Sequence, residues 1–168
     1  MAPDQIGQAM TDEEIASLLA SKGHGVLSLA SENRGYGIPL SFAYDQSHER
    51  IVLEFVDLGD SKKGAFIEAS EEVTLTVHNY EDAETWESVI VTGTLSPLQP
   101  EEVSDRSAAQ FFAQADDVAS DLRWVDDPSV DREWFALEPT EMSGRHGGTL
   151  PHQQSRGLVR FSGYDRTY

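Results

Sequence analysis

The sequence of 168 residues contains no cysteine, and this absence excludes several classes of protein. Without cysteine the chain can form neither a disulfide framework nor a cysteine-ligated metal site. It also lacks an apolar run of about 18 residues, the length that a membrane-spanning helix needs. The first residues show no basic stretch followed by an apolar one, so no secretory signal is expected. We therefore expect one domain, a cytoplasmic location and no membrane partner.

Basic residues are also scarce, because twelve Lys and Arg stand against thirty Asp and Glu, giving a formal charge of −18. A folded chain this acidic repels itself and needs salt to screen its charges. A disordered acidic chain is the alternative, but 39% hydrophobic residues with strand-like alternation favour a folded protein of a high-salt cytoplasm. Nucleic acid is not an expected partner, since its phosphates require a basic face.

Hydrophobic periodicity and turn residues predict three helices and six strands. Thr11 and Glu14 can form a capping box at the first helix, Pro39 predicts an edge or a bulge, and Gly93 predicts a bulge. The predicted helices span 11–22, 61–70 and 101–118, and the predicted strands span 24–30, 36–44, 50–56, 72–79, 86–95 and 134–142. Because hairpins dominate and βαβ alternation is absent, the order favours an α+β fold with a closed or partly closed antiparallel barrel.

The charge changes sign near the end of the chain. Residues 1–142 hold eight basic and twenty-nine acidic residues, whereas residues 143–168 hold four Arg and one Asp. This difference predicts a folded domain over 1–142 and a basic tail over 143–168. Opposite charges attract at modest salt, so the tail is expected to dock on the acidic body of its own or a partner chain.

Familiar catalytic signatures are missing. The chain has no glycine-rich dinucleotide or Walker loop, no H-E-x-x-H and no G-x-S-x-G. Its five histidines lack metal-ligand spacing, so no metal site is expected.

The strongest candidate site is the segment Gly59–Gly64, with the sequence GDSKKG, where a loop enters a predicted helix. Free amides and a partial positive charge make helix N-termini good phosphate sites. Ser61, Lys62 and Lys63 would add a hydroxyl and two ammonium groups. An ordinary capped helix with surface lysines is the alternative. The chain has only one other lysine, Lys22, and this scarcity favours the anion site.

Two further segments are candidates for contacts with a flat ring. An edge or bulged strand around Pro39 and Ser41 would leave backbone groups unpaired, although a plain strand with a proline is the simpler alternative. Trp86 and Ser88 are two residues apart on a predicted strand and so share one face. They could face a cofactor, with a buried core tryptophan as the alternative.

The segments GVLSLA, YGIPLSFAY, GDSKKGAFIEA, VTLTVHNYED and WESVIVTGTL, in this order after a leading helix, resemble the pyridoxamine 5′-phosphate oxidase-related proteins. The resemblance covers about residues 11–100, with a weaker match through the strand near Trp134, and the composition is similar to that of a haloarchaeal member. It implies a split β-barrel of about six strands and a homodimer with FMN at the interface.

The resemblance also implies roles for particular residues. Lys62 and Lys63, with Ser61 beside them, would hold the FMN phosphate. The isoalloxazine ring would lie along Pro39, Leu40, Ser41 and Phe42. Trp86 and Ser88 would approach the cofactor from the other side.

The substrate-phosphate motif of the oxidase itself is absent, and Arg145-His146 is only a partial counterpart. We therefore expect an FMN-dependent oxidoreductase that acts on a different small molecule, with no catalytic residue assigned. The alternatives are a non-catalytic flavin-binding or sensor protein, or a binder of F420 or haem. His78, next to the predicted site, is a candidate proton donor or haem ligand.

Overall fold

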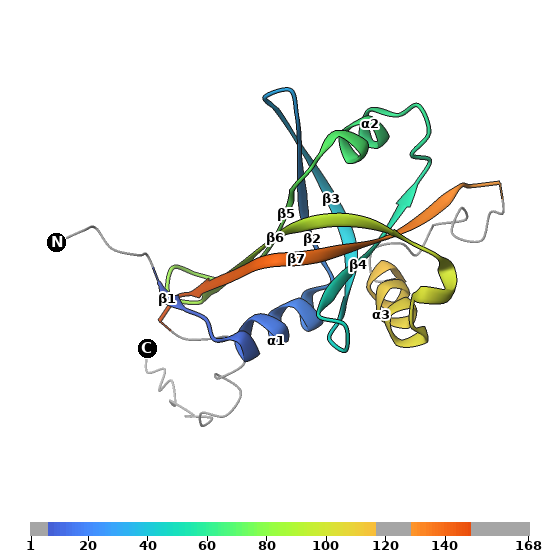
Figure 1. Cartoon of the computed structure of the whole chain (residues 1–168). Helices are drawn as coiled ribbons and strands as arrows, with labels where there is room; N and C mark the ends of the chain where they lie inside the picture. Colours follow the sequence, from blue (N-terminus) through green and yellow to red (C-terminus); the bar gives the residue numbers. More distant parts are fainter. Residues whose placement is uncertain (1–6, 117–128, 149–168) are drawn as a thin grey trace, which may run out of the picture.

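The computed structural model describes residues 7–116 and 129–148 of the chain (Figure 1). Residues 117–128, which include the last two residues of the helix predicted at 101–118, and residues 149–168 of the predicted basic tail lie outside the described residues. The described helices are α1 (Asp12–Lys22), α2 (Lys62–Ala69), α3 (Asp105–Asp116) and a 3₁₀ turn (Pro100–Glu102). The described strands are β1 (Gln8–Ala9), β2 (His24–Ser31), β3 (Arg34–Asp45), β4 (Arg50–Val56), β5 (Val73–Tyr80), β6 (Trp86–Leu98) and β7 (Arg132–His146).

Six strands close into an antiparallel barrel in the order β7-β4-β3-β2-β5-β6, with β6 pairing back onto β7. The short β1 adds to the far end of β7, where β4 no longer pairs with it. Figure 1 shows the long β6 and β7 running side by side across the molecule. The predicted α+β antiparallel split barrel is confirmed.

Helix α1 covers one opening of this barrel. Its capping box forms as expected, because the Thr11 hydroxyl accepts from the Glu14 amide and the Glu14 carboxylate accepts from the Thr11 amide. Ile15, Leu18 and Leu19 are buried in the main core, and the helix contacts β3, β5, β6 and β7. The apolar side chains at helical spacing in this segment therefore close one end of the barrel.

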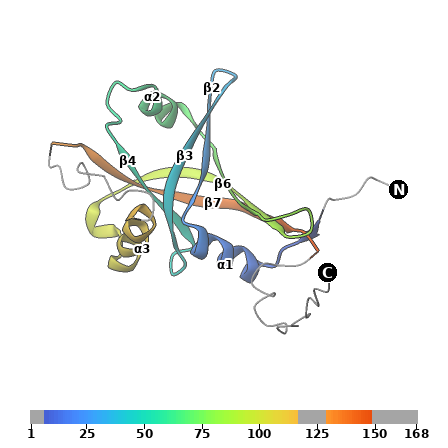
Figure 2. The same ribbon diagram turned by 180° about the vertical axis from the view of Figure 1, so that it is seen from behind.

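Helix α3 packs on the outside of the barrel wall, next to the C-terminal end of α1, where the Gln110 amide donates to the Ala20 carbonyl oxygen at 2.9 Å (Figure 2). Its Phe111 meets Trp134 of β7 edge to face, with ring centroids 5.3 Å apart. The predicted continuous helix over 101–118 is wrong at its start. The Ser104 hydroxyl accepts from the Ser107 amide at 3.1 Å, so a new helix begins at Asp105 after the short 3₁₀ turn.

Strand β7 is longer than predicted, since it runs from Arg132 to His146 instead of 134–142. Its residues 143–146 pair with β6 from Ile90 back to Glu87. The change of charge at residue 143 therefore falls inside a strand and does not mark the end of the sheet. Backbone pairing continues regardless of side-chain charge, so the predicted end of the strand at residue 142 is wrong and the change of composition does not mark it.

Strand β6 also continues beyond its predicted end at residue 95, through Pro97 to Leu98. β5 leaves β6 at Gly93, so a proline at position 97 removes no hydrogen bond to β5. The bulge predicted at Gly93 is confirmed by a register shift between Thr92 and Gly93. A Cβ atom at Gly93 would collide with the Glu138 carbonyl oxygen, which explains the glycine.

Candidate cofactor site

The first half of β3 is a free strand edge. Residues 34–41 pair with β2 on one side, whereas β4 pairs only with Phe42–Asp45 on the other. Within the described chain, the edge from Arg34 to Ser41 thus has a single strand neighbour. Pro39, which pairs with Val26, lies in this stretch, so the edge position predicted from the proline is confirmed.

The four β3 residues predicted to line a flavin ring divide between two faces, because strand side chains alternate. Pro39 is exposed and Ser41 partly exposed on the outer face. Leu40 and Phe42 point the other way, and the Phe42 side chain is fully buried in the main core. The Phe42 backbone amide donates to the Gly23 carbonyl oxygen at 2.8 Å, so the structure does not support the predicted contact of Phe42 with the ring.

The turn into α2 is tightly packed. The Ser61 hydroxyl accepts from the Gly64 amide at 3.0 Å and donates to the Leu58 carbonyl at 2.6 Å. A Cβ atom at Gly64 would collide with that same carbonyl oxygen, so only glycine fits. The sequence predicts Asp60 or Ser61 as the cap of this helix, and the structure has Ser61 in that position. The first-turn amides of Lys62 and Lys63 are left without intrahelical acceptors.

Lys62 places its ammonium group over an aromatic pair. Its Nζ lies 4.5 Å from the centroid of Tyr36 on β3 and 5.8 Å from that of Phe66 on α2. The two rings are 5.2 Å apart, and the Arg34 guanidinium carbon lies 5.8 Å from Phe66. A cation over a ring is held by the ring quadrupole while its outer side stays open. Two cations therefore gather beside the free edge of β3.

Sequence reasoning missed Arg34, Tyr36 and Phe66 as members of this group. The sequence did indicate which residues share a face. Tyr36 lies two residues before Ile38, on the same inward face of β3, and Phe66 lies four residues after Lys62, on the same face of the helix. The sequence does not show that β3 and α2 lie side by side in the fold, and this contact is what brings the residues together.

Lys63 has a different environment from its neighbour. Its Nζ donates to the Val56 carbonyl oxygen at 2.8 Å, and the side chain is partly buried. Adjacent helix residues point about 100° apart, so the two lysines diverge. Lys62 faces the β3 edge, and Lys63 ties α2 to the end of β4.

Trp86 and Ser88 lie on β6, which stands opposite β3 in the closed ring of six strands. Trp86 is partly buried, and its ring lies beside Gly7 and Gly147. Ser88 pairs with His78 and Arg145. The single chain therefore does not bring these two residues next to Lys62.

The outer face of β2, β3, β5 and β6 is a neutral surface, despite the charge of the chain. Val26 is 37% exposed and Ile90 45% exposed, and both are in register with Thr76 between them. We call this the neutral face. Its residues are Val26, Ser28, Gly37, Pro39, Ser41, Thr74, Thr76, Ser88, Ile90 and Thr92, with the exposed His78 at its margin.

The end of β7 carries two further basic side chains, Arg145 and His146. Arg145 lies beside Ser88, and its Nη1 is buried without a hydrogen-bond partner in the described part of the chain. His146 is buried, with its Nδ1 against the Gly147 carbonyl oxygen. Among the described residues, no cluster of His, Asp and Glu could hold a metal ion, and no helix is both long and apolar enough to cross a membrane.

The closed six-stranded split barrel, with a cationic helix N-terminus beside an open strand edge, defines the structural class of this protein. The chain belongs to the pyridoxamine 5′-phosphate oxidase family, whose model matches residues 11–146. A comparison with curated protein sequences gave no significant match.

Solved structures share the fold at low sequence identity. A FAD-binding protein from Mesorhizobium loti superposes with a TM-score of 0.65 at 18% identity, over 85% of this chain and 99% of the other. The FAD-binding protein from Mycobacterium smegmatis gives 0.58 at 18% identity, over 83% and 98%. A conserved hypothetical protein from Mycobacterium tuberculosis, Rv2991, gives 0.64 at 14% identity, over 97% and 98%. At such identities the likeness establishes the fold.

Proposed function

We propose that this chain binds FMN and acts as an FMN-dependent oxidoreductase on a small molecule. The observation that carries the proposal is the Lys62 ammonium, fixed over Tyr36 at the α2 N-terminus beside the free edge of β3. The family match and the two FAD-binding neighbours support a flavin as the cofactor. Among the described ion pairs none involves Lys62, so its charge is available to a phosphate.

The residues present suit a flavin phosphate and ring. Lys62 and the first-turn amides of α2 would hold the phosphate, and the tight Gly64 turn keeps these amides together. The unpaired backbone edge from Pro39 to Ser41 would hydrogen-bond the polar edge of the ring. The bound flavin would supply hydride or electron transfer, while the chain's own groups bind and orient it. Ser61 contributes as the helix cap, and Lys63 as an anchor of the helix.

A homodimer formed through the neutral face completes the proposal. Exposed Val26 and Ile90 surrounded by uncharged residues are typical of a protein interface and untypical of a free surface in so acidic a chain. In such a dimer, Trp86 and Ser88 of the second copy could reach the cofactor that the β3 edge holds. This would explain how residues from opposite sides of one barrel belong to one site.

The test is a fluorescence titration of FMN into flavin-free protein in concentrated potassium chloride. We expect Lys62→Ala to weaken binding and Arg106→Ala, which removes an exposed cation on α3, to leave it unchanged. Equal affinity in wild type and Lys62→Ala would contradict the site. Steady-state NAD(P)H oxidation with an electron acceptor then separates an enzyme from a flavin-binding sensor, and parallel titrations with F420 and haem test the other two ligands.

A further inference from the structure

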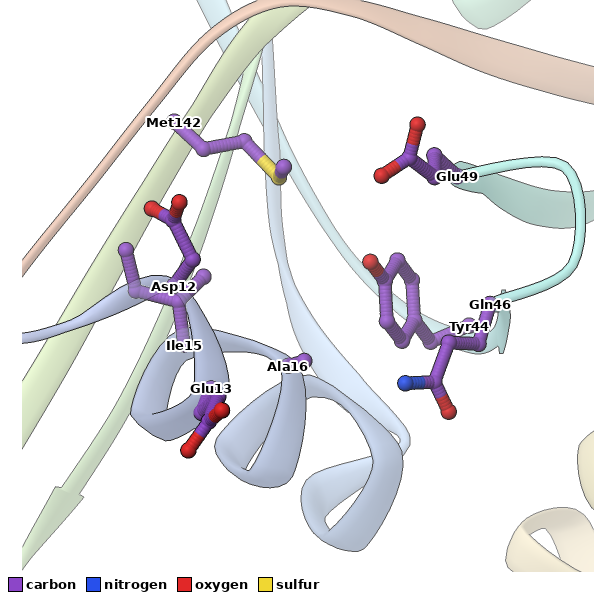
Figure 3. Close-up of a pocket in the computed structure, with 8 residues that line it drawn as sticks. All are labelled: Asp12, Glu13, Ile15, Ala16, Tyr44, Gln46, Glu49 and Met142. Carbon is purple, nitrogen blue, oxygen red and sulfur yellow. The ribbon is translucent and has the colours of Figure 1, made fainter.

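A cavity of about 410 Å³ lies at the end of the barrel that α1 covers (Figure 3). Its walls come from the first turn of α1, the end of β3, the β3–β4 turn and β7. Lining residues include Asp12, Glu13, Ile15, Tyr44, Glu49 and Met142. None of these lining residues belongs to the group around Lys62 and Tyr36 or to the strand edge from Pro39 to Ser41, so this cavity is separate from the proposed flavin site.

Three carboxylates surround the cavity without a cation. Asp12 and Glu13 lie in the first helical turn, where acids also stabilise the helix dipole. Glu49 has no such explanation, since it comes from the β3–β4 turn with a φ of 50°. No ion pair of the described residues includes any of the three, and no described lysine or arginine lines the cavity.

Tyr44 supplies a second, independent observation. The residue is only 8% exposed, and Figure 3 shows its hydroxyl directed into the cavity toward Glu49. No hydrogen bond to this hydroxyl is formed within the described chain, and the hydroxyl oxygen itself is accessible from the cavity, so it is free to bind a ligand. Burial and the nearby Glu49 raise the pKa of Tyr44, so the phenol stays neutral and can both donate and accept.

We propose that this cavity binds a small organic cation, an alkylammonium with a short apolar chain. The ammonium N–H groups would donate to the Glu49 carboxylate and to the Tyr44 oxygen, and the charges of Asp12 and Glu13 at the cavity wall would add to the attraction. Ile15 and Met142 would contact the methylene groups. The volume falls within the range of about 300–1,000 Å³ that small-molecule sites occupy.

A bare metal ion fits less well than an organic cation. Magnesium and calcium need about six oxygen ligands at 2.0–2.6 Å. The described residues offer no cluster of this kind, and Ile15, Ala16 and Met142 give the cavity apolar walls.

The experiment is a calorimetric titration of 1,4-diaminobutane into the full chain. We expect one saturable site for the diamine and no heat of binding for 1,4-butanediol, which has the same length without charge. Magnesium chloride at equal ionic strength should not displace the diamine. Binding of the diol, absence of saturation or displacement by magnesium would overturn the proposal.

Matched variants separate this site from general attraction to an acidic surface. Glu13→Gln with Glu49→Gln removes two charges at the cavity, and Glu81→Gln with Glu84→Gln removes two exposed charges in the β5–β6 turn. We expect the first pair to weaken diamine binding about tenfold or more and the second to leave it within about twofold. Tyr44→Phe should weaken binding by several-fold at unchanged melting temperature. Equal losses in the two double variants would contradict the proposal.

Discussion

The Lys62 ammonium nitrogen lies 4.5 Å from the centroid of the Tyr36 ring, and this contact joins the N-terminus of α2 to the free edge of β3. The neighbouring Lys63 instead donates to the Val56 carbonyl oxygen at 2.8 Å. Two lysines that are equivalent in the sequence therefore have separate tasks. In the proposed site the first would present its cation to the FMN phosphate, whereas the second ties α2 to the end of β4.

The two lysines are expected to respond differently to substitution. Lys62→Ala should weaken FMN binding about tenfold, equivalent to ~1.4 kcal/mol, because a charge-assisted phosphate contact is lost. Lys63→Ala should lower the free energy of unfolding by about 1 kcal/mol, since a partly buried hydrogen bond is lost. Fluorescence titration and urea unfolding measure the two effects. Lys62→Arg serves as the control that keeps the charge, and a reversed pattern would refute this division of roles.

Gly64 is expected to be indispensable for the turn that precedes α2. A Cβ atom there would collide with the Leu58 carbonyl oxygen, whereas a Cβ atom at Gly59 would meet nothing within 4 Å. Gly64→Ala should therefore destabilise the protein by roughly 2 kcal/mol or more and weaken FMN binding, because the turn must shift. Gly59→Ala should leave both unchanged. Urea unfolding checks this, and similar stabilities of the two variants would show that the turn tolerates a side chain.

The neutral face is expected to hold the homodimer together. Ile90→Glu would bury an unpaired carboxylate at the interface, so we expect a monomer at micromolar concentration. Ala113→Glu adds the same charge on exposed α3 and should leave the dimer intact. Sedimentation equilibrium in concentrated potassium chloride distinguishes the two. A wild-type monomer, or an Ile90→Glu dimer, would rule out this face as the interface.

Asp45 is expected to make stability dependent on acidic pH. Burial acts to raise its pKa, but Ser47, His48 and Arg50 hydrogen-bond its carboxylate and together hold the pKa below its ordinary value of 3.8. A pKa that is lower in the folded state stabilises the fold above pH 3.8, and this contribution is lost as the pH falls through the folded value.

Thermal melts of Asp45→Asn and wild type at a series of pH values measure this contribution. We expect the variant to melt lower than wild type near pH 7 and the difference to shrink below about pH 4. Exposed Glu71→Gln is the control for loss of one charge. A difference that stays constant down to pH 3 would show that the carboxylate charge contributes nothing.

Local chemistry in the sequence predicted much of the fold. The Thr11 capping box, the Ser61 cap, the Gly93 bulge and the edge position of Pro39 each rest on one or two neighbouring residues, and the structure contains all four. Short-range rules suffice where a single residue type decides the backbone conformation. The barrel followed from the hairpin order together with the family resemblance.

Long-range features could not be predicted in the same way. The divergence of Lys62 and Lys63 depends on which elements flank α2, and the meeting of Tyr36 with Phe66 depends on how the β2–β3 hairpin packs. The predicted end of β7 at residue 142 is wrong, because strand pairing continues to His146. The Ser104 hydroxyl caps a new helix that begins at Asp105. This local hydrogen bond divides the segment 101–118, which hydrophobic periodicity predicted to be one continuous helix.

The most direct test of the central proposal is an absorption spectrum of the purified chain in concentrated potassium chloride, recorded after excess FMN is added and unbound FMN is removed. We predict that wild-type protein retains the flavin bands near one FMN per chain and that Lys62→Ala retains much less. A colourless wild-type protein after the same treatment would contradict FMN binding at the β3 edge.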